Sequence, residues 1–224
     1  MEQKEYKPVP DVECLKYHGT PEKPDIKIFV SHRIDLDSQT IDNPLYIPVR
    51  CGAVYDEREN VTMLGDDTGD NISEKRMSFC ELTVQYWAWK NVKADYYGLC
   101  HYRRYLSFCD REYEGKAELH YQVPEKLITQ KTIKKYGLHD STKMRNAIES
   151  VDAIIPTMWD TTTFFGPKGT TKSVYEMWKS HEGVLIGKDA LDITMEIVKQ
   201  KYPDVYKSAK KYVNQRYVCG FNTF

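Results

Sequence analysis

The distribution of apolar residues predicts short strands separated by polar stretches. Ile26, Ile28 and Val30 recur at every second position, which is the period of a β-strand, and polar residues follow them. Pro48 interrupts a second apolar segment, and Pro156 ends the last one. The pattern predicts strands over residues 25–32, 96–101 and 151–157, a short apolar segment over 43–53, and a strand-like segment at the C-terminal end of the sequence.

Helical periodicity fills the intervals between these segments. Phe79, Leu82, Tyr86 and Trp89 follow the spacing of one helix face, which predicts a single helix over residues 73–91 with these side chains in the core. Residues 64–75, rich in Asp and Gly, predict a loop before it. Other helical stretches are predicted within the mostly polar residues 110–150, around 172–182 and over 189–201, where Pro203 ends the last one before a final helical turn.

Strands that alternate with helices favour an α/β fold, with a mostly parallel sheet covered by helices on both faces. Residues 1–24 contain four prolines and little apolar periodicity, so we expect an extended lead-in there. Residues 25–224 are expected to form a single domain, although two small domains would also fit this length.

Composition and charge argue against several classes of protein. The 224 residues carry 32 Lys and Arg against 33 Asp and Glu, and 41% are apolar, which argues against a disordered chain or a basic nucleic-acid-binding module. There are 17 Tyr against 7 Phe. Tyrosine suits half-wet clefts and sugar faces, but a few clustered core and surface tyrosines would give the same count.

Cysteine use and the lack of a signal-like N-terminus predict a cytoplasmic protein. The six Cys residues form no C-x-x-C pair and no zinc-finger spacing, and reduced thiols are expected. No apolar run approaches the roughly 18–20 residues that span a bilayer. We therefore expect a soluble protein or one peripheral to the membrane.

Three polar segments are candidates for chemistry: Ser31-His32 after the first strand, the Asp-rich loop, and the residues after the 96–101 strand. In a doubly wound sheet these segments meet at the carboxyl edge, where ligands bind. An arginine there can hold a diphosphate through two oxygens. Because Arg103 and Arg104 are adjacent, only one of them would face the cleft unless the strand has ended and turned.

Each segment also has an ordinary structural interpretation. His32 could be a satisfied core histidine. The Asp-rich loop could be a plain turn or a weak calcium loop, although it lacks EF-hand spacing. The arginine pair could bind Glu112 or Glu114. No nucleotide-binding glycine motif, nucleophile elbow or zinc-binding motif is present.

Several motifs occur together and in order: IKIFVSHR, NPLYIPVRCGA, GDDTGDNIS, CELTVQYWAWKN and YYGLCHYRRYLSF. From Asp25 to Phe224 the sequence resembles a bacterial family labelled a domain of unknown function, whose members occur as capsular and exopolysaccharide biosynthesis glycosyltransferases. The resemblance implies a GT-A-like, Rossmann-like fold that binds a nucleotide sugar, usually a UDP sugar. It further implies transfer of a hexosyl unit to a saccharide or lipid-linked acceptor.

On this template the site residues fall into two groups. The resemblance implies donor contacts from Ser31, His32, Asp66, Asn71, Tyr102 and Asn222. It implies a catalytic group of Glu81, His101, Arg103 and Arg104. Glu81 would order the donor sugar or pair with one of the arginines, and the alternative is a helix-surface glutamate.

Most GT-A enzymes place an Asp-x-Asp metal motif where this sequence has His101-Tyr102-Arg103-Arg104. Guanidinium and imidazole groups can supply fixed positive charge there, so metal-independent transfer without a cofactor is favoured. The aspartates of the 64–75 loop keep Mg²⁺ or Mn²⁺ as an alternative.

The C-terminal segment departs from the family, where an Asn-Met-Phe-type segment continues into further residues. Here the sequence ends at Phe224, so we expect a truncated member with Asn222 on its last strand. A non-catalytic or decayed nucleotide-sugar-binding domain, or a protein-interaction module, is therefore the rival interpretation. Residues 199–216, with six basic residues and one acid, predict peripheral contact with the inner face of the membrane or a solvated helix face.

Overall fold

The computed structural model describes residues 6–116, 119, 121–163, 169–180, 187, 189–220 and 223–224, together with the backbone of 165–166. The chain forms two compact units. Unit 1 takes the described residues of 1–112, 125–155 and 222–224, and unit 2 takes those of 113–124 and 156–221. The single domain predicted over 25–224 stays a prediction, because compactness alone does not show whether the units fold independently.

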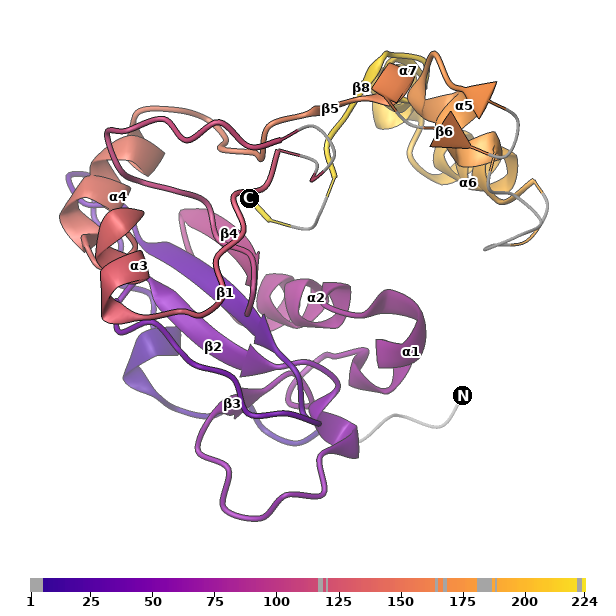
Figure 1. Cartoon of the computed structure of the whole chain (residues 1–224). Helices are drawn as coiled ribbons and strands as arrows, with labels where there is room; N and C mark the ends of the chain where they lie inside the picture. The colour runs from indigo at the N-terminus through magenta and orange to yellow at the C-terminus, as the bar shows by residue number, and fades with distance from the viewer. Residues whose placement is uncertain are drawn as a thin grey trace. The chain divides into compact units, whose positions relative to one another are not determined.

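Unit 1 is built on a four-stranded parallel sheet in the order β3-β2-β1-β4 (Figure 1). β1 (Ile26–His32) lies at the centre, with β2 (Tyr46–Arg50) on one side and β4 (Tyr96–His101) on the other. In register, Ile28 pairs with Tyr46 and with Gly98. β3 (Leu64–Gly65) is a short edge strand at the start of a segment that the sequence predicted to be a loop. The parallel sheet with flanking helices confirms the predicted α/β, GT-A-like fold.

Helices cover both faces of this sheet (Figure 1). Phe29 packs in one core with Trp87 of α2 (Leu82–Asn91), and their rings meet edge to face at 6.1 Å. Ile28 and Val30 pack in the other core with α3 (Gln130–Lys135) and α4 (Ser141–Glu149). Strand alternation thus sends neighbouring β1 side chains into two separate cores.

The helix predicted over 73–91 is interrupted. It consists of the 3₁₀ turn η3 (Ser73–Lys75), α1 (Arg76–Phe79) and α2, and Cys80 between α1 and α2 has a φ of 46°. The predicted core stripe is also wrong. Trp89 is 65% exposed, whereas Val84 and Trp87 are fully buried. The buried face of α2 consists instead of Thr83, Val84, Trp87 and Ala88.

The strand predicted over 151–157 does not form in unit 1, where residues 153–155 are irregular. The position beside β4 is occupied by Phe224 instead. Its backbone N–H and C=O exchange hydrogen bonds with Leu99, each at 3.1 Å. Because the edge of β4 is already paired there, residues 151–154 pack as irregular chain around a cavity in the same unit.

The N-terminal lead-in is tied to unit 1 by polar contacts. Lys27 is buried in β1, where its ammonium donates to Asp25 at 2.6 Å and to the carbonyl of Lys16 at 2.8 Å. Tyr17 donates to Asp95 at 3.0 Å. Short 3₁₀ turns complete the unit at η1 (Glu13–Leu15) and η2 (Ala53–Tyr55).

Unit 2 consists of short strand pairs and three helices that contact one another: α5 (Val174–Lys179), α6 (Ala190–Lys201) and α7 (Pro203–Val213). The helix predicted over 189–201 is confirmed, but Pro203 also starts α7, in agreement with proline's preference for the first helical turn. The antiparallel pairs are β5 (Trp159–Asp160) with β8 (Tyr217–Val218), and β6 (Phe165–Gly166) with β7 (Gly169–Thr170), and the 3₁₀ turn η5 spans Thr161–Thr163.

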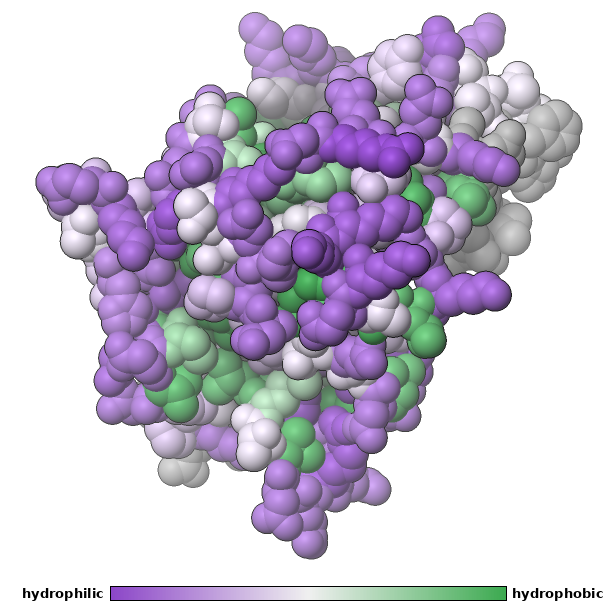
Figure 2. Space-filling view, turned by 60° about the vertical axis from the view of Figure 1, so that its left-hand side comes forward, coloured by the Kyte–Doolittle hydropathy of each residue, from purple (hydrophilic) through white to green (hydrophobic). Residues whose placement is uncertain are grey.

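The described surface is predominantly polar. Hydrophilic residues cover most of the face shown in Figure 2, and hydrophobic residues form separate patches on it. No helix among the described residues has the length and hydrophobicity needed to cross a bilayer.

Candidate functional site

A tight turn at the carboxyl end of β4 carries the predicted arginines. The strand ends at His101, and the Arg104 N–H closes the turn on the His101 carbonyl at 2.8 Å. The Arg103 N–H donates to His101 Nδ1 at 3.3 Å. The strand has therefore ended and turned, so strict alternation does not assign the two arginines to opposite sides.

Tyr102 is the centre around which the turn packs. Its side chain is buried, and its ring lies 4.3 Å from that of His101 and 6.2 Å from that of His32. The guanidinium of Arg103 lies over the same ring at 5.1 Å, a cation–π contact. The pKa of Arg33 is raised first by its hydrogen bonds to Asp35 and further by one to Tyr102. The structure thus joins the ends of β1 and β4 through Tyr102.

Both site histidines are poor bases. Burial lowers the pKa of His101 to about 4, with Arg104 lowering it further and the carboxylate of Glu81 acting in the opposite direction. Burial also lowers the pKa of His32 to about 4. Both rings are therefore neutral at pH 7, and fixed positive charge at this edge comes from the arginines and not, as expected from the sequence, from imidazole as well.

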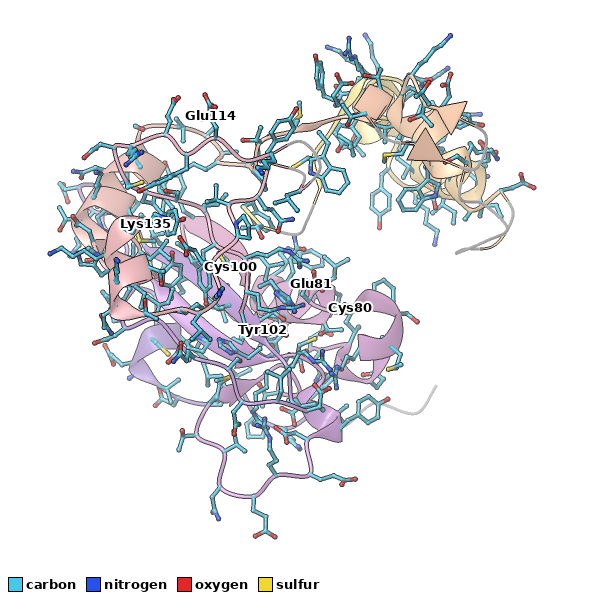
Figure 3. All side chains as sticks on the ribbon, in the orientation of Figure 1. Cys80, Glu81, Cys100, Tyr102, Glu114 and Lys135 are labelled. Carbon is cyan, nitrogen blue, oxygen red and sulfur yellow. The ribbon has the colours of Figure 1, made fainter. Side chains whose placement is uncertain are left out.

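Glu81 lies directly before α2 and belongs to the same neighbourhood as the turn. Figure 3 shows Glu81 where α2 begins and Tyr102 just after β4. The electrostatic effect of Glu81 on His101 shows that the helix start and the turn are within reach of each other. The structure therefore brings Glu81 together with the predicted turn residues, which are His101, Tyr102, Arg103 and Arg104. His32 at the end of β1 lies in the same neighbourhood.

Ser31 and His32 do not act as one pair, because alternation along β1 sends them to opposite faces. His32 is 1% exposed, its Nδ1 lies 2.6 Å from the Ser38 hydroxyl, and its Nε2 has no partner among the described residues. Ser31 is buried on the α2 side and hydrogen bonds to the Cys51 thiol. That both bind the donor stays a prediction.

Asp66 is fully buried, and protein donors fill its carboxylate. Its oxygens accept from the backbone N–H groups of Gly52 and Ala53 at 2.9 Å each, and from the hydroxyls of Ser73 and Thr83 at 2.5 Å each. These four bonds tie the end of β2 to the start of α2. The prediction that Asp66 binds the donor stays untested, but in this structure its acceptor positions are taken.

The other polar residues of the loop are also engaged. Asn71 is buried, donating to the Gly69 carbonyl at 2.8 Å and accepting from the Ser73 N–H at 3.2 Å. Asp67 pairs with Lys7 at 2.6 Å, and Asp70 accepts from the Tyr86 hydroxyl at 3.1 Å. Among the described residues, no three His, Cys, Asp or Glu side chains are grouped so that they could hold a metal ion.

A charged cleft beside the turn was not found from the sequence. It encloses about 610 Å³ and is lined by the loops after β1 and β2 and by α1, with Arg33, Arg58 and Arg76 in its wall. Asp35 pairs with Arg33 and Arg76, and the pKa of Asp35 is well below its usual range chiefly because Arg33 hydrogen bonds to it. Its arginines lie far apart in sequence, so no local motif marks the cleft.

One predicted donor contact, Asn222, lies outside the described residues. The neighbouring Thr223 is buried, and Phe224 pairs with β4.

Comparisons with known proteins were made against families, curated sequences and solved structures. A family model described as a domain of unknown function (DUF4422) matches residues 27–224. The apo structure of WbbM, a bifunctional glycosyltransferase, matches with a TM-score of 0.75 and 28% sequence identity, covering 89% of this chain and 33% of that chain. The chain thus spans a third of that protein's length. No curated protein matches the sequence.

Proposed function

The chain belongs to the DUF4422 family, and on this premise we propose that it is a glycosyltransferase that moves a hexosyl unit from a nucleotide sugar to a saccharide or lipid-linked acceptor. A UDP sugar is the proposed donor, and capsular or exopolysaccharide biosynthesis is the proposed setting. The fold it shares with part of a bifunctional glycosyltransferase supports this assignment.

The observation that carries the proposal is the turn at the carboxyl edge of the sheet. Arg103 and Arg104 follow directly after β4, beside a neutral His101 and within reach of Glu81. Carboxyl edges of parallel sheets are where such folds bind ligands. Two guanidinium groups there suit the diphosphate of a nucleotide sugar, since each can bind two oxygens at once.

The proposed chemistry assigns a role to each group. The acceptor hydroxyl attacks the anomeric carbon and loses its proton to solvent. The bond from that carbon to the diphosphate oxygen breaks, and the nucleoside diphosphate leaves. Arg103 and Arg104 stabilise the charge that develops on the leaving diphosphate. Glu81 offers carboxylate oxygens to the sugar hydroxyls. The charged cleft with Arg33 and Arg76 extends the donor site from Tyr102 along the ends of β1 and β2.

Metal-independent transfer is part of this proposal. Its support is the chemistry of the residues at the edge, where arginines occupy the place in which most GT-A enzymes have metal-binding carboxylates. Turnover should then persist in excess EDTA. A strict requirement for added Mg²⁺ or Mn²⁺ would contradict this part and leave the transferase assignment intact.

The test of the proposed function is release of free nucleoside diphosphate from a panel of nucleotide sugars, with and without saccharide acceptors. We expect release from one donor class, and loss of release in the Arg103→Ala/Arg104→Ala double variant. Lys126→Ala, an exposed cation elsewhere in unit 1, is the control that should retain activity.

Two rival functions predict different results in the same assay. A decayed nucleotide-sugar-binding domain would bind UDP in calorimetry without any turnover. A protein-interaction module would neither bind UDP nor release it. Either result, obtained with the folded protein and the whole donor panel, would overturn the transferase proposal.

Peripheral contact with an anionic membrane is the proposed setting for a lipid-linked acceptor. Among the described residues, Lys201, Lys207, Lys210 and Lys211 have no acidic partner, and Val205 beside them is 54% exposed. Each basic residue near an anionic leaflet contributes about 1 kcal/mol. The end of α6 and the outer side of α7 therefore support adsorption.

Co-sedimentation with vesicles tests this membrane contact. Binding to anionic but not neutral vesicles is expected, with a decrease at high salt. The Lys207→Glu/Lys211→Glu variant should lose it, whereas Lys131→Glu/Lys134→Glu in α3 should keep it. Equal recovery of the parent protein in the supernatant with both vesicle types would leave only a solvated helix face.

A further inference from the structure

A cavity lies on the α4 side of the sheet, and none of the residues assigned to the donor site lines it. It encloses about 200 Å³ within unit 1. Ile28 of β1, Cys100 of β4 and Ile148 of α4 form part of its wall, and the irregular residues 151–154 close another side. An engineered apolar cavity of about 150 Å³ holds benzene, so a molecule of this size or slightly larger fits here.

One polar group in the wall has no partner. Tyr46 is 6% exposed and lines the cavity, and its hydroxyl forms no hydrogen bond with any described residue. A buried hydroxyl without a partner is costly. A ligand oxygen inside the cavity would remove that cost, which no purely hydrocarbon occupant could do.

The remaining wall favours a neutral occupant. Most lining side chains are apolar, and burial raises the pKa of the Cys100 thiol to about 12, so it stays uncharged at pH 7. The carboxylate among the lining residues belongs to Asp152, which is exposed and would repel an anion at the entrance. Tyr97 and Val151, 41% and 43% exposed, also lie on the wall.

We propose that this cavity is a binding site for a neutral, mostly hydrocarbon molecule that carries one hydroxyl or carbonyl oxygen, held by a hydrogen bond to Tyr46. The site is separate from the proposed donor site, and it does not depend on the proposed transferase activity. A free small alcohol and a lipid alcohol share this chemistry, and they differ in chain length.

Calorimetry with matched probes tests the proposal. Phenol and benzene differ by the hydroxyl group alone. Phenol should bind about three- to tenfold more tightly than benzene, as one neutral hydrogen bond allows. Tyr46→Phe should abolish this preference while benzene still binds. Tyr105→Phe is the matched control, because the buried Tyr105 hydroxyl also has no partner within the described part of the chain, yet Tyr105 is not part of the cavity wall.

Further probes distinguish a free small alcohol from a lipid alcohol and test whether binding takes place in the cavity. 1-Hexanol should bind and hexanoate should not, because of the charge at Asp152. Stronger binding of farnesol than of 1-hexanol would identify a lipid alcohol, and the reverse a free one. Ala153→Trp, placed at an exposed lining position, should block every probe without disturbing the core.

Two results would overturn the proposal. The first is no binding of phenol, benzene or 1-hexanol at millimolar concentration to a protein that unfolds cooperatively, which would mean that the cavity is dry or holds water only. The second is a preference for phenol that survives in Tyr46→Phe, which would place the hydrogen bond elsewhere.

Discussion

The Asp-rich loop after β3 and the arginine turn after β4 were both candidates for binding a ligand at the carboxyl edge of the sheet, and their polar groups differ in the structure. In the loop, Asp66 is fully buried and accepts four hydrogen bonds from the protein. In the turn, the backbone of Arg104 closes the chain on His101, and Arg103 is exposed. The polar groups of the loop form hydrogen bonds within the protein that stabilise the fold, whereas the turn presents positive charge at the carboxyl edge of the sheet.

This difference shows how to judge whether a polar residue at a sheet edge can bind a ligand. A carboxylate whose acceptor positions are all filled must break protein bonds before it can contact a ligand. A guanidinium at the same edge has five N–H donors and keeps several for a ligand after one contact is made. A polar group whose hydrogen bonds are all made within the protein therefore supports the fold, and one that keeps free donors can bind a ligand.

The largest expected effect is at Asp66. Asp66→Ala leaves two backbone N–H groups and two hydroxyls without their acceptor, so we expect the free energy of unfolding to fall by about 3–5 kcal/mol. Urea denaturation measures it. Asp67→Ala, which removes a pair with the mostly exposed Lys7, should cost about 1 kcal/mol or less. Equal losses of unfolding free energy in the two variants would show that Asp66 contributes no more to stability than Asp67 does.

The next effect is the pH dependence of stability that His32 creates. Its folded pKa of about 4 lies below the unfolded value of about 6.5, so the unfolded state binds more protons between these values. The stability is therefore complete above about pH 6.5 and is lost as pH falls through 4, by roughly 3 kcal/mol in all.

Urea denaturation at several pH values measures this dependence. His32→Gln should flatten it, while His139→Gln, at an exposed position of unit 1, should leave it unchanged. An unaltered pH profile in His32→Gln would show that burial does not control this ring.

A smaller change in free energy is expected at the turn. Arg103→Ala and Arg104→Ala should each weaken UDP binding by about 1.5–3 kcal/mol, because a charge-assisted hydrogen bond is lost. Calorimetry measures the affinity, and melting curves should barely move. A large fall in melting temperature with unchanged UDP affinity would assign the turn to the fold, as for Asp66.

The smallest effect on stability is expected at Glu81. Glu81→Gln should change the free energy of unfolding by less than about 0.5 kcal/mol, while turnover falls. Since the carboxylate raises the pKa of His101, its removal should lower that pKa further, which NMR titration of the imidazole can follow. Unchanged turnover and an unchanged His101 titration would show that Glu81 is an ordinary helix-surface residue with no role in the site.

Sequence pattern was sufficient for the strands at the centre of the sheet. β1 and β4 were predicted because their alternating or continuous apolar residues reflect burial on both faces, a property of each strand by itself. β2 lies within residues 43–53, which the sequence marked only as a short apolar segment. The place of the arginine turn at a carboxyl edge followed from this, since parallel strands end together. The resemblance to a glycosyltransferase family agrees with the matched family and with the solved structure.

Pattern was not sufficient where two segments compete for one position. Residues 151–157 have the apolar character of a strand, yet Phe224 occupies the edge of β4 beside them. The helix break at Cys80 was also missed by the pattern. Asp66 accepts hydrogen bonds from Ser73 before the break and from Thr83 after it, and these contacts depend on how the loop folds back against the helix.

By itself the sequence determined the class of fold, the central strands and the residue types gathered at one edge, because these depend on local periodicity and on the order of elements along the chain. Only the tertiary structure decided which polar groups are hydrogen bonded within the protein and which can still bind a ligand. Three features are consequences of burial and of neighbours brought together by the fold: Asp66 is saturated, His101 is neutral, and Tyr46 has no hydrogen-bond partner among the described residues. Desolvation and hydrogen-bond satisfaction are properties of packing in three dimensions, which no local pattern encodes.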